Sequence, residues 1–223
     1  MVKQKNKNVA KTVIDVCMII ALLCLTAYQV TGEKLHEWIG IGMTVLVIVH
    51  QIINVKWYGG LFKGRYNPYR VAVTIVNSLL LVSLVLTALS GMSMSSYAVP
   101  FLYGMTPVSF ARRVHLAISY WSFVLMGFHL GMHVRALVAK TKLRKAVRVA
   151  FLVVFCLTAG VGLWLFLKNK VYDYMLFRSA FAFFDYDKAG VTVFFENLMM
   201  LLFWMLAGHA VTKLLTSKGR VSL

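Results

Sequence analysis

The 223-residue sequence predicts an all-α protein, a polytopic membrane bundle of six transmembrane helices. Three observations support this fold class. Hydrophobic residues make up 60% of the chain and charged residues only 14%, whereas soluble domains have about 25% charged residues. The apolar residues are concentrated in long blocks, each close to the roughly 20 residues that a helix needs to cross the hydrocarbon core. The blocks lack the period-two alternation of a transmembrane barrel, so helices are expected.

Six apolar blocks can be placed along the chain, joined by connections of different lengths. They cover residues 10–31, 34–55, 71–95, 112–137, 147–168 and 193–214. The first four are expected to form a four-helix bundle within residues 1–137, of the kind that holds cofactors between facing helices. Residues 138–223 are expected to add two further spanning helices. We expect a tight turn at residues 31–33, and a short interfacial helix in the outer loop 169–192, where aromatic and charged residues are mixed.

Lysine and arginine residues predict how the helices are oriented. Most of them lie in the N-terminal tail, in segments 56–70 and 135–148, and in the C-terminal tail from Lys213. The positive-inside rule predicts that these segments, and therefore both termini, face the cytoplasm. The net charge of +17 is thus spread over several connections. Nucleic-acid binding is not expected, because it requires a contiguous basic face.

The spacing of the histidines is the most informative local pattern. The chain has six of them: His36, His50, His115, His129, His133 and His209. His36 and His50 are 14 residues apart in the second block, and His115 and His129 are also 14 residues apart in the fourth. Fourteen residues return nearly to the same face of a helix after a rise of about 21 Å. Each of these two helices therefore carries two imidazoles on one stripe, near opposite sides of the membrane.

The second and fourth blocks run in the same direction, so their histidines match in depth. His36 is expected to face His115 near the outer surface, and His50 to face His129 near the inner surface. Histidine is a standard axial ligand of haem iron, and imidazole suits iron. The chain has no Cys-x-x-Cys-His motif for covalent attachment. The spacing therefore predicts two haem b groups, the outer iron bound by His36 and His115 and the inner iron bound by His50 and His129.

Other polar residues near these positions have two interpretations each. His133 lies one turn from His129 and could replace it as the inner ligand. His133 and His209 could serve an inner quinone or proton site, or could simply be interfacial histidines. Arg112 and Arg113 lie one turn before His115, where they could bind haem propionates by charge-assisted hydrogen bonds or anchor the helix at the interface.

Small residues accompany the predicted ligands. Gly127 and Gly131 flank His129, and Gly91 lies in the third block. Small residues let helix backbones approach closely in membranes, and a flat haem would need the same space. The sequence does not distinguish these two roles.

Two other classes of function are compatible with the sequence. A proton or metal-ion transporter would use Asp15, Asn77, Glu196 and the histidines as an intramembrane relay. In that case His129 and His133, four residues apart on one helix face, could begin a metal site. The third class is a membrane scaffold, in which the last two helices bind a partner complex.

Several runs of residues resemble a known family. They are Ala27-Tyr28-Gln29-Val30-Thr31-Gly32, His36-Glu37-Trp38-Ile39-Gly40, His50 with Asn54 and Trp57, Ala111-Arg112-Arg113-Val114-His115, Ser119-Tyr120-Trp121, Gly127-Phe128-His129-Leu130-Gly131-Met132-His133 and Phe181-Ala182-Phe183-Phe184-Asp185. These runs are similar to those of the flavinylation-associated cytochrome family. The resemblance extends over most of the chain, and the first four blocks carry the specific motifs.

The resemblance implies a bacterial inner-membrane b-type cytochrome, laid out like other four-helix diheme cytochromes. Such proteins pass electrons between the quinone pool, menaquinone or ubiquinone, and flavinylated proteins outside the membrane. The role implied is that of an electron-transfer subunit, linked to a quinol oxidoreductase activity. His36, His50, His115 and His129 match the family's axial ligands. Covalent flavin is not expected, because the chain has no Asp-x-x-Ser/Thr-Gly-Ala-Ser/Thr attachment motif.

Overall fold

The computed structural model describes residues 2–138 and 145–218, and these residues form helices joined by turns and loops, without a strand. The helices are α1 (Val2–Thr26), α2 (Tyr28–Ile53), α3 (Lys56–Gly60), α4 (Pro68–Met92), the 3-10 turn η1 (Pro100–Leu102), α5 (Val108–Val138), α6 (Lys145–Lys168), α7 (Val171–Met175) and α8 (Gly190–Lys218). The predicted all-α class is confirmed. Residues 139–144 and 219–223, which belong to the basic segment 135–148 and the C-terminal tail predicted to face the cytoplasm, lie outside the described residues.

Among the described residues, five helices are long and apolar enough to cross a membrane. They are α1 over Val9–Thr26, α2, α4, α5 over Val108–Val134 and α8 over Gly190–Ser217. The sixth predicted span, 147–168, forms α6, whose described apolar stretch Leu152–Lys168 falls short of the length of the other five. The structure therefore supports a multi-pass membrane protein with five clear spans.

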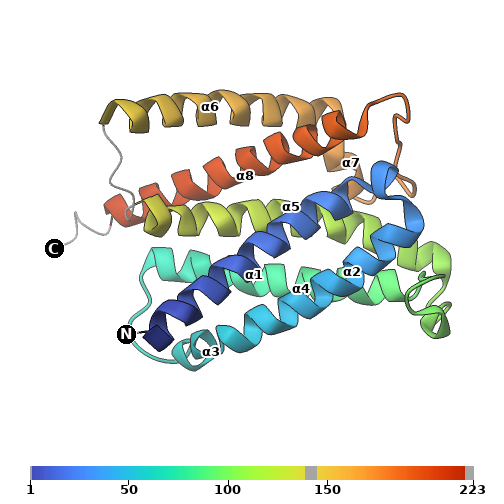
Figure 1. Ribbon diagram of the computed structural model, residues 1–223, viewed down its shortest axis with the longest axis horizontal. Helices are drawn as coiled ribbons and strands as arrows, with labels where there is room; N and C mark the ends of the chain where they lie inside the picture. The colour runs from blue at the N-terminus through green and yellow to red at the C-terminus, as the bar shows by residue number, and fades with distance from the viewer. Residues whose placement is uncertain (1, 139–144, 219–223) are drawn as a thin grey trace.

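The long helices lie side by side along one axis of the molecule (Figure 1). The start of α1 and the end of α8 lie at the same end of this bundle, and α6 runs beside α8 along the same axis. Helix α5 is central, because it packs on α4 and on α8, while α1 packs mainly on α2. By contrast, α2 and α5 make little backbone contact with each other. This arrangement leaves side chains, rather than backbones, to join the α1–α2 pair to α5.

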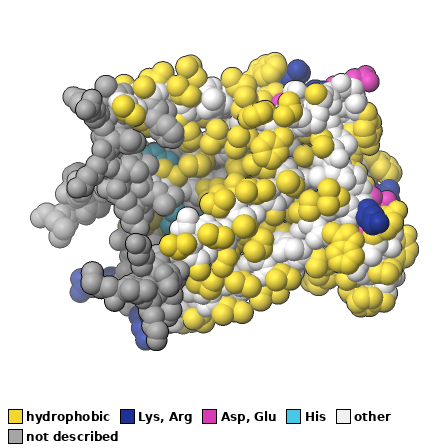
Figure 2. Space-filling view, in the orientation of Figure 1, with side chains coloured by type: hydrophobic (Ala, Val, Ile, Leu, Met, Phe, Trp, Pro, Cys, Tyr) yellow, Lys and Arg dark blue, Asp and Glu magenta, His cyan; other side chains and the backbone are white. Residues whose placement is uncertain are grey.

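The side chains exposed along the helices are those expected of a lipid-facing surface. Large apolar residues cover much of the face drawn in Figure 2, and charged side chains are seen toward its two ends. Val45, Leu79 and Leu157, on α2, α4 and α6, are each more than half exposed. Soluble monomers rarely expose apolar patches of this extent, whereas lipid requires them.

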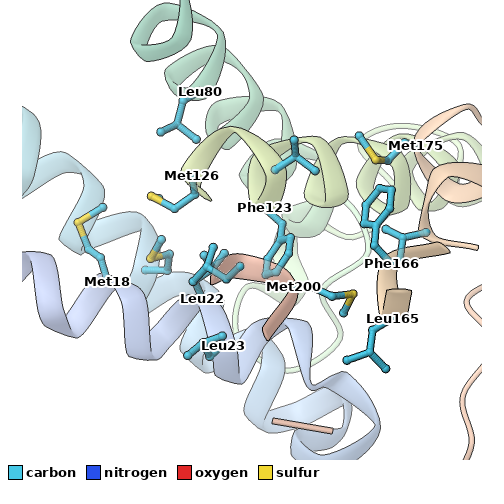
Figure 3. Close-up of a cluster of buried hydrophobic side chains, with 14 residues drawn as sticks. Met18, Leu22, Leu23, Leu80, Phe123, Met126, Leu165, Phe166, Met175 and Met200 are labelled. Carbon is cyan, nitrogen blue, oxygen red and sulfur yellow. The ribbon is translucent and has the colours of Figure 1, made fainter. Parts of the chain in front are cut away.

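One buried cluster joins the two predicted parts of the chain (Figure 3). It contains Met18 and Leu22 of α1, Phe123 of α5, Phe166 of α6 and Met200 of α8. Residues on both sides of the boundary expected near residue 137 thus share one core. Helices α6 and α8 therefore pack against the first four long helices.

Glycines explain how closely α8 approaches its neighbours. A Cβ atom added to Gly131 on α5 would meet the Met205 carbonyl oxygen of α8, and one added to Gly162 on α6 would meet the Met199 carbonyl oxygen. Gly127 likewise faces Trp204. Of the two roles open for Gly127 and Gly131, the structure therefore shows the close packing of α5 on α8.

One boundary differs from the prediction, whereas the predicted turn and the predicted short helix are present. The first block ends early, since α1 stops at Thr26 and α2 already begins at Tyr28. Within α2, Gly32 has φ 68° and ψ 172°, which breaks the helix at the position predicted for the tight turn. A residue with a side chain rarely adopts this conformation. In the loop 169–192, the predicted short helix is present as α7.

Candidate functional site

His36 and His115 form the closest pair among the predicted ligands. Their ring centroids, on α2 and α5, are 6.1 Å apart and their ring planes are at 75°. An imidazole nitrogen lies about 2 Å from a bound first-row metal ion, so two imidazoles on opposite sides of one metal have centroids about 6 Å apart. The backbones of α2 and α5 are held apart while these two rings meet. This pair, here called the outer pair, therefore fits the axial ligands of one haem.

Helix α4 holds the ring of His115 in one orientation. Its Nδ1 lies 3.0 Å from the Thr87 carbonyl oxygen and 3.4 Å from Ser90 Oγ. Because a carbonyl oxygen only accepts hydrogen bonds, Nδ1 carries the proton and donates, which leaves Nε2 free to bind a metal. A Cβ at Gly91 would lie 3.1 Å from His115 Cε1, so the glycine makes room for this ring.

The predicted inner ligands have the same type of support. His50 Nδ1 donates to Asp15 Oδ1 of α1 at 2.9 Å, and His129 Nδ1 donates to Asn77 Oδ1 of α4 at 2.8 Å. In both residues Nε2 again remains free for a ligand bond. Carboxylate and carbonyl acceptors behind a metal-binding imidazole are the usual means of fixing its ring. Three of the four predicted ligands thus have their Nδ1 atom held by a neighbouring helix.

The inner rings themselves are arranged differently from the outer pair. Among the described side chains, His50 and His129 do not form a ring contact like that of His36 with His115. Instead the ring of His129 lies 4.7 Å from that of His133, at 58°. The structure therefore does not decide between His129 and His133 as the partner of His50 in the inner site. The Nδ1 atom of His129 is the one held by Asn77.

The remaining predicted residues lie apart from one another. His133 is exposed on α5, and His209 on α8 has a buried Nδ1 atom without a hydrogen-bond partner. No hydrogen bond or ring contact joins these two described side chains. Arg112 and Arg113 are exposed, and the Arg112 guanidinium lies 5.6 Å from the centroid of the Phe181 ring, a cation–π contact. A role of these arginines toward propionates stays a prediction.

Glu37 is a positioning residue that sequence reasoning missed. Its carboxylate accepts hydrogen bonds from Ser95 Oγ at 2.7 Å and from the backbone N–H groups of Ser96, Tyr97 and Ala98 at 2.8 to 2.9 Å. These donors belong to the loop between α4 and α5, so Glu37 fixes the depth of α2 relative to that helix pair. The signal for this role in the sequence was a carboxylate directly after a predicted ligand, His36.

Within the described residues, no group of three or more histidine, cysteine, aspartate or glutamate side chains is arranged to hold a bare metal ion. A six-coordinate haem iron needs only two axial protein ligands. Glu196, considered for a relay, forms an ion pair with Lys188 at 3.0 Å near the start of α8.

Comparisons with protein-family models, curated proteins and solved structures find no match for this chain. The function proposed below therefore rests on the site and on the sequence motifs.

Proposed function

We propose that this chain is a diheme b-type cytochrome of the bacterial cytoplasmic membrane. In this proposal it passes electrons between the quinone pool and a redox protein on the outer side, which the family resemblance suggests is flavinylated. The observation that carries the proposal is the outer pair: two imidazoles from separate, co-directional helices, 6.1 Å apart, one of them held through Nδ1.

In this proposal the four histidines at matching depths hold the two haems. His36 and His115 would bind the outer iron, and His50 and His129 the inner one. When bound, each haem supplies reversible one-electron chemistry at its iron. The protein orients each imidazole, excludes water with apolar helices, and tunes ligand basicity through the acceptor behind Nδ1.

The two sites differ in the charge of these acceptors. Asp15 presents a carboxylate to His50, whereas Thr87 and Asn77 present neutral carbonyl groups to His115 and His129. A negative acceptor makes the imidazole a stronger donor, which favours the oxidised iron. The Asp15 carboxylate is therefore expected to make His50 the most strongly electron-donating of these three imidazoles.

Membrane placement is part of the same proposal. We take α6 as the sixth span, which places both termini on one side. The excess of lysine and arginine in the tails and in segments 56–70 and 135–148 identifies that side as cytoplasmic. His36 and His115 then lie near the outer surface.

The contacts of the polar residues considered for a transport relay support the cytochrome proposal instead. Asp15 and Asn77 each hydrogen-bond to a predicted ligand, and Glu196 pairs with Lys188. Each thus has a local partner that accounts for its presence in an apolar helix.

The proposal is tested by the colour of the purified protein. The chain is isolated in detergent, reduced, and examined by visible absorption and by a pyridine haemochrome assay. We expect the spectrum of b-type haem. A colourless protein, purified from cells that make haem, would contradict the proposal and favour a transporter or scaffold.

A further inference from the structure

The connection from α6 to α8 is anchored on the helix that carries His115. We call residues 171–190 the outer strap. Trp121 of α5 donates from Nε1 to the Met175 carbonyl oxygen at 3.1 Å, and the rings of Tyr120 and Tyr174 stack with centroids 5.1 Å apart. The Tyr174 hydroxyl in turn accepts from the backbone N–H of Phe183 at 3.1 Å. The strap is therefore held against α5 within two turns of His115.

The other end of the strap lies on the start of α2. Gln29 donates from Nε2 to the Asp185 carbonyl oxygen at 3.0 Å. The Phe184 ring stacks on the Tyr28 ring, with centroids 5.4 Å apart and planes at 22°. Gly190 packs on Val30 so closely that an added Cβ would lie 3.0 Å from its Cγ1 atom. The strap thus links the helices of both outer ligands.

Tyr28 connects the strap to a predicted haem ligand. Its ring centroid lies 5.1 Å from that of His36, with the planes at 73°, an edge-to-face contact. In an unbroken helix, residues eight positions apart would be separated by about 12 Å along the axis. The non-helical Gly32 between them folds the Tyr28 turn back, which permits the contact.

His36 also differs from the other predicted ligands. Its Nδ1 atom is buried and has no hydrogen-bond partner, whereas Nδ1 of His50, His115 and His129 each meets an acceptor. The Leu25 backbone of α1 lies near the His36 ring, and the contact with the Tyr28 ring adds an edge-to-face packing of defined geometry.

We propose that Tyr28, backed by Phe184 of the outer strap, is the positioning residue that orients His36 and shields the outer haem from water. This inference rests on the proposed function and deepens it. It gives the α6–α8 part of the chain a role in the site: these helices carry the strap that closes its outer end. The ring series continues to Tyr186, whose centroid is 6.1 Å from that of Phe184 and whose side chain is 73% exposed.

The test measures the midpoint potential of each haem and the low-spin electron paramagnetic resonance signals of the oxidised full-length protein. The outer haem is the component lost in His36→Ala. We expect Tyr28→Ala and Phe184→Ala to lower its potential and change its signal, because water entering the site favours the charged oxidised form. Tyr28→Phe should retain wild-type values, since it keeps the ring. The matched control is Phe183→Ala, whose ring is 83% exposed and which should change nothing.

Loss of only the outer haem in Tyr28→Ala would also support the inference. It is overturned if Tyr28→Ala and Phe184→Ala leave the outer haem as in the wild type, if both haems shift equally, or if Phe183→Ala has the same effect. A wild-type protein without haem is a different outcome: it contradicts the proposed function and the inference with it.

Discussion

At the scale of single residues, three of the four predicted ligands have a hydrogen-bond acceptor at Nδ1 that comes from a neighbouring helix. A histidine spacing can place rings at matching depths, but the atom bonded to Nδ1 decides which nitrogen is free and how basic it is. Asp15, Asn77 and Thr87 supply these acceptors from helices α1 and α4. They lie far from their histidines in sequence, so spacing alone could not assign them.

The charge on Asp15 gives a direct prediction. In Asp15→Asn, the acceptor of the His50 Nδ1 proton becomes neutral, so the imidazole becomes a weaker donor and the oxidised iron is less favoured. We expect the inner-haem midpoint potential to rise in a redox titration followed by visible absorption. The outer haem serves as the internal control and should keep its wild-type potential. If the inner potential does not move, Asp15 does not tune that site.

A second residue-scale prediction separates His129 from His133. Because Asn77 holds Nδ1 of His129, we expect His129→Ala to lose one haem per chain and His133→Ala to keep both. The pyridine haemochrome assay measures both variants at equal protein concentration. The opposite pattern would make His133 the inner ligand.

At the scale of elements, the outer pair depends on how α2 is docked. Glu37 binds the α4–α5 loop through four hydrogen bonds. Gly32 bends α2 so that the turn before it contacts the same site. Two helices that make little backbone contact are thus aligned by one carboxylate and one glycine.

Removal of this carboxylate should weaken the outer site first. In Glu37→Ala, the loop N–H groups lose a charged acceptor, which costs about 2 kcal/mol of folding free energy. We expect lower occupancy of the outer haem and a lower midpoint in thermal unfolding. Glu33→Ala, at an exposed position in the same turn region, is the control and should match the wild type. Equal effects of both substitutions would argue against a docking role for Glu37.

The packing of α6 on α8 can be tested with two glycines on one helix. A Cβ at Gly162 would lie 3.0 Å from Met200 N and closer still to the Met199 carbonyl oxygen, whereas a Cβ at Gly160 has no atom within 4 Å. We expect Gly162→Ala to destabilise the protein by about 1–3 kcal/mol, the usual effect of overpacking. Gly160→Ala should not destabilise the protein in the same thermal unfolding assay, because alanine favours the helix and meets no atom there. Similar stabilities for the two variants would contradict the packing described.

At the scale of the whole molecule, hydropathy predicted the helical class and the approximate position of every long helix. This succeeds because lipid requires each spanning segment to satisfy its own backbone hydrogen bonds. Boundaries were less accurate: the first block was extended to residue 31, but α1 ends at Thr26. The turn at Gly32 was predicted because glycine marks such breaks.

The candidate site was predictable only in part. The 14-residue spacing indicated His36 and His115, since helix geometry converts spacing into depth. The contacts of Tyr28, Glu37 and the outer strap depend on loops that meet across the bundle, and no periodic pattern encodes them. Gly127 and Gly131 had two interpretations because close packing and cofactor space require the same small side chain, and only the position of α8 distinguished them.

The central claim is that four histidines bind two haems in two pairs. The most direct test is the ratio of haem to protein in the wild type and in single alanine variants of His36, His115, His50 and His129. We predict two haems per chain in the wild type and one in each variant, with His36→Ala and His115→Ala losing the same spectral component. Wild-type protein without haem, or His36→Ala and His115→Ala variants that lose different components, would contradict the pairing.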